Sequence, residues 1–394
     1  MLIGLVGKPS VGKSTFFKAA TLAEVEIASY PFTTIKANQG IGYVKIDCID
    51  KELNTQCMPA HGFCIAHKRF VPIDLMDVAG LVSGASEGKG LGNKFLDDLR
   101  QADVFIQIVD VSGTTDAEGK ITKDYNPCND VLILEEELNK WYFNILMKVW
   151  RSFARKAEIE NTNFSEAVVK QFSGLKVNEE HVKRVLLKLS FSEKPSNWND
   201  SQLMKFASEL RKESKPMIIA ANKIDLENGK ENYKNLKLAY PNSIIIPCSA
   251  DSELALREAA KVNLISYIPG EKHFDILGNL NEKQIAALNK IKTNVLDEFE
   301  QGTGVQAILN MAVFDILGYL AIFPASANKL SDSKGRILPD CFLLPPKSTA
   351  LDFAYHLHTD FGNNFIRAID ARTKRALGKA YELKNRDALE IVTR

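Results

Sequence analysis

The chain has 394 residues, of which 45% are hydrophobic and 25% are charged, values typical of a globular protein rather than a disordered one. Fifty Lys and Arg residues against 49 Asp and Glu residues give a formal net charge of +1. This excludes an acidic-tail protein and a protein held on nucleic acid or anionic lipid by its overall charge alone. The length predicts two or three domains.

The first predicted element is a short buried strand over residues 2–6, followed by a loop and a helix that begins near Thr15. The loop matches G-x-x-x-x-G-K-[ST], which between a strand and a helix indicates phosphate binding. Glycine lets successive backbone N–H groups face an anion, and the helix N-terminus adds favourable dipole charge. The predicted nucleotide-binding residues here are Gly7, Lys8, Pro9, Ser10, Val11, Gly12, Lys13, Ser14 and Thr15.

Magnesium ligands and phosphate sensors are predicted along the next segments. The Lys13 ammonium is expected to reach the β- and γ-phosphates, and the Ser14 hydroxyl to ligate Mg²⁺. A strand over residues 70–76 ends in Asp77, which can hold Mg²⁺, and the Gly80 N–H can bond the γ-phosphate. Thr34, in the run YPFTTI, can ligate Mg²⁺ through its hydroxyl. The predicted metal ligands are thus Ser14, Thr34 and Asp77, and the predicted catalytic residues are Lys13, Thr34 and Gly80.

A cluster of cysteines and histidines precedes that strand: Cys57, His61, Cys64 and His67, with Cys48 nearby. These residue types can bind zinc, but no C-x₂-C pair is present, so unrelated structural residues are the alternative. The glycine-rich run after Gly80 suits a switch segment that changes between an ordered and a disordered state; the alternative is a flexible surface loop without a switch role.

The middle of the chain predicts a helical insertion over residues 115–210. Leu134, Leu138, Trp141 and Ile145 recur at helical spacing, and a second stripe includes Val182. Such stripes usually pack on each other as a bundle rather than forming a groove for a partner.

A predicted base-recognition site follows the insertion. A short buried strand over residues 217–220 leads into Asn222, Lys223 and Asp225, the pattern N-K-x-D. A carboxylate at Asp225 accepts from the N1–H and N2–H₂ groups of guanine, whereas adenine offers neither donor there. Another strand over residues 243–247 ends before Ser249 and Ala250, whose backbone N–H would face guanine O6. Carboxyl ends of strands are where open α/β sheets bind ligands.

The remaining segments complete the predicted architecture. Residues 251–303 read as helical, and a helix over about 304–318 is expected to return to the nucleotide-binding domain. That domain is therefore predicted to be discontinuous, comprising residues 1–114, 211–250 and about 304–318. Residues 320–394 carry four short apolar runs around one helix, and basic residues that either form a solvated face or contact RNA phosphates: Arg367, Arg372, Lys374, Arg375, Lys379 and Lys384.

A cytoplasmic location without membrane contact is also predicted. The N-terminus has no positive segment before its apolar run, unlike a signal peptide. The most apolar long stretch, residues 307–323, is shorter than the ~20 residues of a spanning helix and contains Asn310 and Asp315. The six widely spaced cysteines are expected to be reduced thiols.

These motifs resemble the Obg-like GTPases, and in particular the archaeal YchF-related branch. The similarity is carried by GKPSVGKST, YPFTTIKAN, DVAGLVSGASEGKGLGNKFLDDL, NKID and CSA. Residues 320–394, with LPPKSTALDFAYHLHTDFGNNFIRAIDARTKRALG, resemble a TGS domain. The resemblance implies an α/β P-loop fold with a mostly parallel sheet flanked by helices, a helical insertion and a C-terminal ubiquitin-like β-grasp domain.

Four positions depart from the patterns of relatives. YchF proteins lack N-K-x-D and prefer ATP, whereas this chain keeps Asp225, which implies GTP. Their switch-loop histidine corresponds here to Ser86, and Ser10 stands where potassium-dependent relatives have Asn. Leu81 occupies the position of the water-orienting glutamine of Ras-like enzymes and cannot hydrogen-bond water.

The sequence therefore predicts a GTP-hydrolysing switch that uses Mg²⁺, with slow intrinsic hydrolysis stimulated by a partner. By resemblance, a ribosome or RNA is the expected partner, bound through the C-terminal domain and the helical insertion, and no recognition of a DNA sequence is expected. Two alternatives stay open: an ATPase of YchF type, and an RNA- or ribosome-binding adaptor whose nucleotide is structural.

Overall fold

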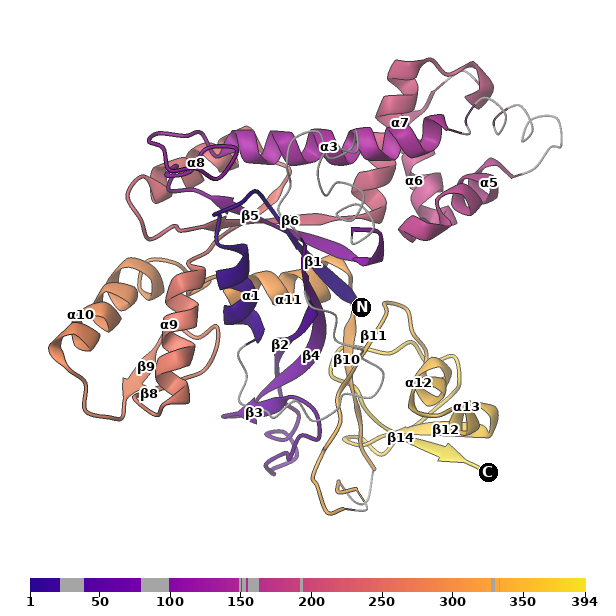
Figure 1. Cartoon of the computed structure of the whole chain (residues 1–394). Coiled ribbons are helices and arrows are strands. Elements are labelled where there is room, and N and C mark those ends of the chain that lie inside the picture. The colour runs from indigo at the N-terminus through magenta and orange to yellow at the C-terminus, as the bar shows by residue number, and fades with distance from the viewer. Residues whose placement is uncertain are drawn as a thin grey trace.

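The structure is a computed structural model (Figure 1). It describes residues 1–21, 39–78, 99–148, 150, 154, 163–191, 194–326, 330–332 and 334–394. In Figure 1 the helical insertion lies above the central sheet and extends to the upper right, and the C-terminal domain lies at the lower right.

A seven-stranded sheet forms the centre of the molecule. Its strands are β1 (Leu2–Val6), β2 (Gln39–Asp47), β3 (Phe63–Ile65), β4 (Lys68–Asp77), β5 (Val104–Asp110), β6 (Met217–Asn222) and β7 (Ile244–Pro247). The order is β2-β4-β1-β5-β6-β7, with β3 paired to β4. β1 and β4–β7 pair in parallel, whereas β2 and β3 are antiparallel to β4. The predicted mostly parallel α/β fold is confirmed.

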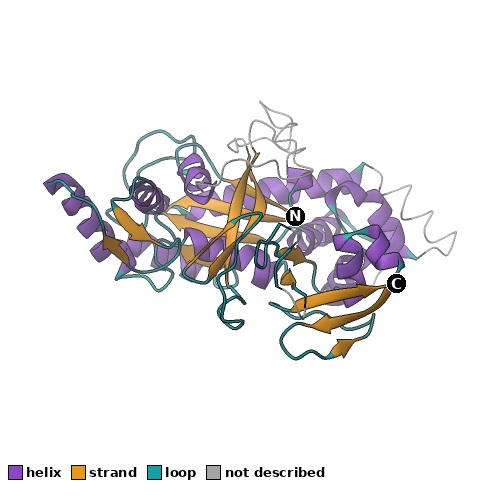
Figure 2. Ribbon diagram, turned by 90° about the horizontal axis from the view of Figure 1, so that it is seen from below, coloured by secondary structure: helices purple, strands orange, loops and turns teal. Residues whose placement is uncertain are grey.

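Both faces of this sheet are covered, because its central strands carry apolar side chains on both sides. On one face, Ile3 and Leu5 of β1 share a core with Phe16 of α1 (Lys13–Thr21) and Ile308 of α11 (Val305–Asn310). On the other face, Val6 packs in a core with the insertion helices. The view from below shows the twisted sheet with helices on either side (Figure 2).

The insertion between β5 and β6 consists of packed helices. They are α3 (Cys128–Met147), α5 (Phe164–Gln171), α6 (Glu179–Leu189) and α7 (Asp200–Ser214), with single 3₁₀ turns at Ser173–Leu175 and Pro195–Asn197. The predicted stripes pack on each other, because Leu138 and Trp141 share one core with Val185. The Trp150 and Trp198 rings stack within the same core, with centroids 5.5 Å apart.

Asparagine residues begin several helices. The side chains of Asn178, Asn199 and Asn281 each accept the N–H of the third helical residue, whose own side chain bonds back to the asparagine N–H. This reciprocal cap satisfies N–H groups that a helix start leaves unpaired.

The segment after β7 differs from the predicted helical stretch. It contains α9 (Ala250–Lys261) and α10 (Glu282–Ile291), followed by a π-helical turn at Lys292–Leu296. Between α9 and α10 lies an antiparallel hairpin of β8 (Ile265–Tyr267) and β9 (Phe274–Ile276), so the prediction was wrong there. Pro269 and Gly270 lie just beyond Ile268, the residue that follows β8; Gly270 has a φ of +76°, and both residues disfavour a continuous helix.

Helix α11 packs against the edge strand β2. The Gln306 amide donates to the Tyr43 carbonyl at 2.9 Å. Asn310 Nδ2 donates to the Lys45 carbonyl at 2.8 Å, and Asn310 Oδ1 accepts the Lys45 N–H at 2.9 Å. These contacts favour the predicted return of residues 304–318 to the nucleotide-binding part.

The apolar stretch 307–323 is divided between helical and extended structure. It comprises most of α11, a π-helical turn at Met311–Ile316, and most of β10 (Leu320–Pro324). Across the ranges that the structure describes, no helix is long and apolar enough to cross a membrane.

The C-terminal domain is a five-stranded sheet with one main covering helix. Its elements are β10, β11 (Phe342–Leu344), α12 (Ala350–Leu357), α13 (Thr359–Asn363), β12 (Phe365–Asp370), β13 (Ala376–Leu377) and β14 (Ala388–Thr393). The order is β11-β10-β14-β12-β13, and Phe353 of α12 is buried against the sheet with Ile322 and Leu389. The four predicted apolar runs are strands, while α13 and β13 are too short to give a sequence signal.

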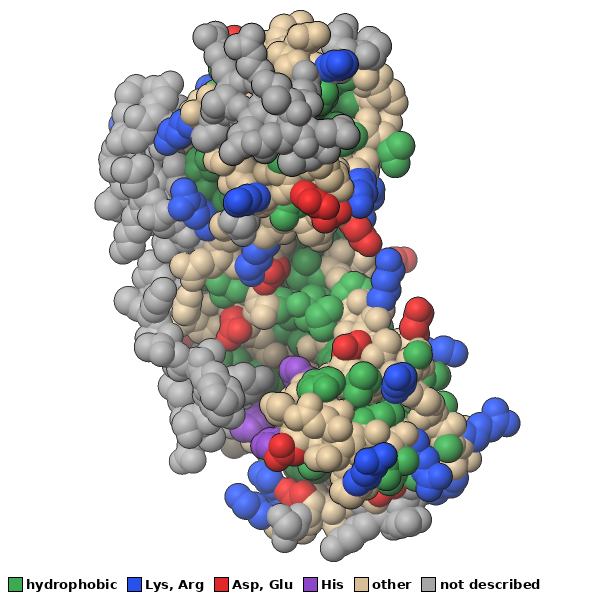
Figure 3. Space-filling model, turned by 90° about the vertical axis from the view of Figure 1, so that its right-hand side faces the viewer, with side chains coloured by type: hydrophobic (Ala, Val, Ile, Leu, Met, Phe, Trp, Pro, Cys, Tyr) green, Lys and Arg blue, Asp and Glu red, His purple; other side chains and the backbone are tan. Residues whose placement is uncertain are grey.

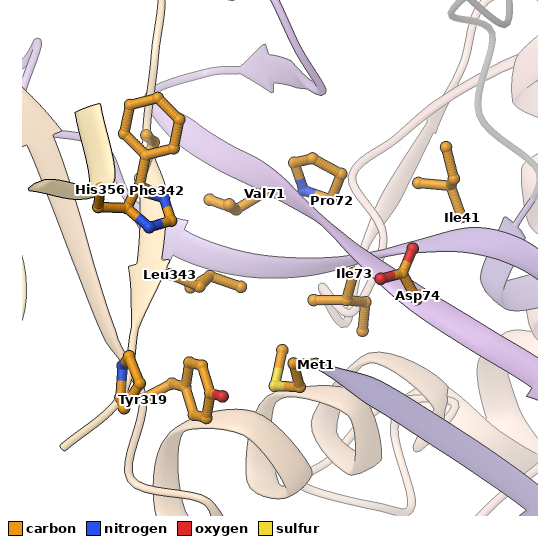
Figure 4. A pocket seen from close by; sticks show the side chains of 12 residues that line it. Met1, Ile41, Val71, Pro72, Ile73, Asp74, Tyr319, Phe342, Leu343 and His356 are labelled. Atoms are coloured by element: carbon orange, nitrogen blue, oxygen red, sulfur yellow. The ribbon is translucent and has the colours of Figure 1, made fainter. Parts of the chain in front are cut away.

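The C-terminal domain contacts the segment that links β2 to β4. The Met58 N–H donates to the Ile337 carbonyl, and the Ala60 N–H donates to the Pro339 carbonyl, both at 2.8 Å. Beside this contact, a cavity of about 360 Å³ lies between β4, the N-terminus and the C-terminal domain. Met1, Asp74, Tyr319 and Phe342 are among its lining residues (Figure 4). A space-filling view shows a hollow with apolar side chains between the two ends of the molecule (Figure 3).

We expect Asn310→Ala to destabilise the chain by about 1–3 kcal/mol, because it leaves the backbone N–H and C=O of Lys45 without these partners at the sheet edge. Urea denaturation measures the free energy of unfolding. Asn242→Ala, on the exposed turn before β7, is the control and should change it by less than about 0.5 kcal/mol. Equal effects of the two substitutions would contradict the role given to Asn310.

Candidate nucleotide-binding site

The predicted phosphate-binding loop joins β1 to α1 in a conformation that requires its glycines. Gly7, Ser10 and Gly12 have φ angles of +150°, +64° and +94°. A Cβ atom on Gly7 would lie 2.6 Å from the Ile108 carbonyl oxygen, and one on Gly12 would lie 2.4 Å from Asn222 Nδ2. Both distances are far below van der Waals contact, so larger residues would displace the loop or its neighbours.

Lys13 begins α1 and turns its side chain back into the loop. Its Nζ donates to the carbonyl oxygens of Gly7 and Lys8, both at 3.0 Å. Burial lowers the pKa of Lys13, while the charge of Asp77 acts in the opposite direction. A phosphate beside this ammonium would supply negative charge and so favour its protonated form. The placement suits the predicted phosphate ligand.

Asp77 ends β4 next to the first turn of α1, and its two carboxylate oxygens differ in their contacts. Oδ2 accepts the Ser14 hydroxyl at 3.2 Å, whereas Oδ1 is buried and has no hydrogen-bond partner among the described residues. Burial raises the pKa of Asp77, and Lys13 and Ser14 oppose that shift. A buried carboxylate oxygen without a partner, next to a hydroxyl, is a donor set that Mg²⁺ prefers. Ser14 and Asp77 therefore fit the predicted metal site.

Asn222, at the end of β6, joins the phosphate-binding loop to the segment after β7. Its Nδ2 donates to the Val11 carbonyl at 2.8 Å, and its Oδ1 accepts the Ala250 N–H at 3.0 Å. The Asn222 residue is 3% exposed, so both hydrogen bonds are protected from water. The predicted base-recognition segment and the phosphate-binding loop are thus brought together across more than half of the chain.

The other base-recognition residues lie around this amide. Asp225 is half-buried and lines an open hollow with Asn228 and Asn294. Ser249 is buried, and its hydroxyl donates to Ser252 Oγ at 2.7 Å. The Ala250 N–H, which was expected to face guanine O6, donates to Asn222 Oδ1. Its contact with guanine stays a prediction, and that contact would require the N–H to be shared between Asn222 and the base.

An acidic residue absent from the predicted site organises this edge of the sheet. Asp110 ends β5 and is fully buried. It accepts from Lys223 Nζ at 2.7 Å, from the Ser112 hydroxyl at 2.5 Å and from the Thr115 hydroxyl at 2.9 Å. Although burial acts to raise it, these donors hold the pKa of Asp110 below its ordinary value. The sequence signal that could have identified Asp110 was the run Asp-x-Ser at the end of a buried strand.

Lys8 uses its side chain within the protein. Its Nζ lies 3.0 Å from Asp130 Oδ2, donates to the Thr115 carbonyl at 2.7 Å and sits 3.9 Å from the centroid of the Tyr125 ring. The predicted nucleotide contact of Lys8 would therefore come from its backbone. In the same loop, Pro9 and Ser10 are exposed and Thr15 is half-buried in α1.

The remaining predicted residues lie outside the described part of the chain. They are Thr34 and Gly80, together with Leu81 and Ser86 of the predicted switch segment. Their roles stay predictions from the sequence.

Comparison with known families gives three matches along the chain. The model described as "50S ribosome-binding GTPase" matches residues 2–144. The model "Obg-like GTPase YGR210-like, G4 motif-containing domain" matches residues 220–326, and the TGS domain model matches residues 334–393. These matches follow the order in which the sequence motifs occur.

Whole-length relatives agree with these matches. The chain is 46% identical to the GTP-binding protein MJ1332 of Methanocaldococcus jannaschii, covering 100% of this chain and 99% of the relative. It is 28% identical to the ribosome-binding ATPase YchF of Buchnera aphidicola, covering 93% of this chain and 86% of that protein. A crystal structure of a GTP-binding protein from Pyrococcus horikoshii OT3 has a TM-score of 0.78 and 38% identity, with full coverage of both chains. The chain therefore belongs to the Obg-like GTPases of YchF type.

Proposed function

We propose that this GTPase is a ribosome-associated switch that selects guanine through Asp225 and hydrolyses GTP slowly until a partner accelerates it. The observation that carries the proposal is the bridge made by Asn222. It holds the N-K-x-D segment against the phosphate-binding loop, so one ligand can reach both the loop and the Asp225 carboxylate. The ATPase alternative rests on the name of a 28% identical relative, whereas Asp225 is a residue of this chain.

The chemistry that we propose is largely electrostatic. Lys13 and the loop N–H groups would stabilise negative charge on the transferring phosphoryl group. Mg²⁺ held by Ser14 and Asp77, with Thr34 proposed as a further ligand, would neutralise charge on the phosphate oxygens. Leu81 offers no hydrogen bond to water, which supports slow turnover by the chain alone.

Ribosome association is proposed from the C-terminal domain and from the names of relatives. YchF proteins at 28–29% identity are named ribosome-binding ATPases. In this chain, five of the six predicted basic residues are exposed and have no ion-pair partner in the described part: Arg367, Lys374, Arg375, Lys379 and Lys384. The sixth, Arg372, donates to Glu52 at 2.6 Å and instead contributes to domain contact. The exposed set suits binding to RNA phosphates.

The nucleotide preference is tested by Asp225→Asn. Asparagine cannot accept from both guanine donors, so we expect GTP affinity to fall by about 10- to 100-fold and ATP affinity to stay unchanged. Isothermal titration calorimetry with Mg²⁺ measures both. Glu227→Gln removes the same charge two residues further along the exposed loop and should retain GTP affinity. Tighter binding of ATP than of GTP by the unaltered chain would establish the ATPase alternative.

The magnesium site is tested by Asp77→Asn, with Asp74→Asn on the same strand as its control. Burial raises the pKa of both carboxyls, so the folded state disfavours their ionised forms. At pH 7, each variant should therefore be as stable as the unaltered chain or more stable. The unaltered chain should gain stability as the pH falls through the raised pKa and the carboxyls become protonated. Only Asp77→Asn should abolish the Mg²⁺ dependence of GTP affinity. Full Mg²⁺ dependence in that variant would exclude Asp77 as a ligand.

Ribosome binding is tested by co-sedimentation with GDP and with a non-hydrolysable GTP analogue. We expect the analogue to increase the pelleted fraction, and Arg367→Glu/Arg375→Glu/Lys379→Glu to reduce it several-fold. A matched reversal on exposed lysines elsewhere, Lys261→Glu/Lys283→Glu/Lys290→Glu, should leave it unchanged. Binding that is identical with both nucleotides would favour the adaptor alternative.

A further inference from the structure

Three cysteines and one aspartate converge in the segment that links β2 to β4. Cys48 follows β2, Asp50 and Cys57 lie in the loop, and Cys64 is in β3. Cys48, Asp50 and Cys57 are at most 4% exposed. One ligand atom from each of the four residues lies within 4.8 Å of every other.

We propose that these four side chains bind one zinc ion. In a tetrahedral site with Zn–S near 2.3 Å and Zn–O near 2.0 Å, neighbouring ligand atoms are about 3.5–3.8 Å apart. The Cys48 and Cys57 sulfurs are 3.6 Å apart, and the Cys64 sulfur is 3.8 Å from Asp50 Oδ2. These two distances are close to those of a zinc tetrahedron, and all four ligand atoms lie within 4.8 Å of one another. Three soft sulfur donors favour zinc over Mg²⁺ or Ca²⁺.

The surroundings hold the carboxylate in position for such a role. Asp50 Oδ2 accepts the Cys57 N–H at 3.0 Å, and Oδ1 lies 2.9 Å from His67 Nδ1. Ligating carboxylates in metal sites are usually fixed by hydrogen bonds of this kind. Arg69 is opposite Cys64 in the β3–β4 register and is 1% exposed, with its Nε unpartnered among the described residues. Its positive charge would offset part of the negative charge of three thiolates and a carboxylate around one Zn²⁺.

A disulfide explains this arrangement less well. The Cys48 and Cys57 sulfurs are 3.6 Å apart, beyond the ~2.05 Å of an S–S bond. A bond between them would leave Cys64 and the buried Asp50 carboxylate without a common function. Zinc binding uses all four groups, with each thiol releasing its proton as it ligates the ion.

The site differs from the sequence prediction in its members. Cys57 and Cys64 of the possible Cys/His cluster lie together and Cys48 joins them, but Asp50 stands where that cluster would have used histidine. His67 contacts Asp50 rather than the sulfurs, and His61 is outside the group. The three cysteines are separated by eight and six residues, unlike the close cysteine pairs of common zinc motifs, so their spacing alone does not indicate the site.

The ion would be structural and would stabilise the contact between the segment that links β2 to β4 and the C-terminal domain. Met58 and Ala60, which donate to carbonyls of the C-terminal domain, lie between the ligands Cys57 and Cys64. Arg69 also reaches that domain, donating to the Pro339 carbonyl at 2.8 Å. Fixing the loop on zinc would therefore fix the surface on which the C-terminal domain rests.

Metal content of the tag-free full chain, purified without chelators, tests the proposal. We expect about one zinc per chain by mass spectrometry, and thiolate-to-cobalt charge-transfer absorption after exchange with Co²⁺. Cys57→Ser and Cys64→Ser should weaken zinc binding by more than about tenfold, whereas Cys128→Ser, outside the group, should not. Chain that takes up no metal from added Zn²⁺, or single variants that bind it as tightly as the unaltered chain, would overturn the site.

A second measurement on the unaltered chain avoids variants that fail to fold. Removing zinc with a chelator should make three thiols reactive and accelerate hydrogen exchange at the Met58 and Ala60 amides, and added Zn²⁺ should reverse both effects. Hydrogen exchange and thiol reactivity that do not change when the chelator is added would refute the proposal. Non-reducing peptide mass spectrometry that finds Cys48 linked to Cys57 would refute it as well. GTP affinity is measured separately, so failure of the zinc site and failure of the nucleotide site are distinguishable.

Discussion

The nucleotide site depends on one buried amide, that of Asn222. Its two polar atoms are both satisfied, one by the Val11 carbonyl and one by the Ala250 N–H, so its orientation is fixed. A rotated amide would place a donor against a donor and leave both partners unpaired in a dry environment. This is also why position 12 must be glycine, since a Cβ there would collide with Asn222 Nδ2. The two motifs thus constrain each other.

Charge around the phosphate-binding loop is divided in a way that favours one lysine as the ligand. Lys8 and Lys223 are each paired at short distance with a buried carboxylate, Asp130 and Asp110. Among the residues that the structure describes, Lys13 donates to loop carbonyls, and burial lowers its pKa. Lys8 and Lys223 thus hold the scaffold through ion pairs. Lys13 has no carboxylate at hydrogen-bond distance in the described part of the chain, so its ammonium stays available to phosphate.

Sequence reasoning found those parts of the fold and site whose signals are local. The strand–loop–helix pattern located Gly7 to Thr15, and an apolar run before N-K-x-D located β6. The role of Asp130 was not predicted, because its partner Lys8 is more than a hundred residues away and no sequence pattern links the two. The β8–β9 hairpin was not predicted, because each strand has only three residues, too few to display the alternation of apolar and polar residues that indicates a strand.

The same limit applies to the cysteine group, where topology rather than spacing brings the ligands together. Cys48 follows β2 and Cys64 lies in β3, and these two strands pair with opposite edges of β4. The loop between β2 and β3, which carries Asp50 and Cys57, completes the group, whose ligand atoms lie within 4.8 Å of one another. β4 then runs from Arg69, which contacts the C-terminal domain, to Asp77, which faces the phosphate-binding loop. At about 3.3 Å per residue, the two residues are roughly 26 Å apart along a strand held in register by β1 and β2. Because a strand paired on both sides cannot stretch or slip without breaking a whole ladder, β4 fixes the distance between the domain contact and the magnesium ligand.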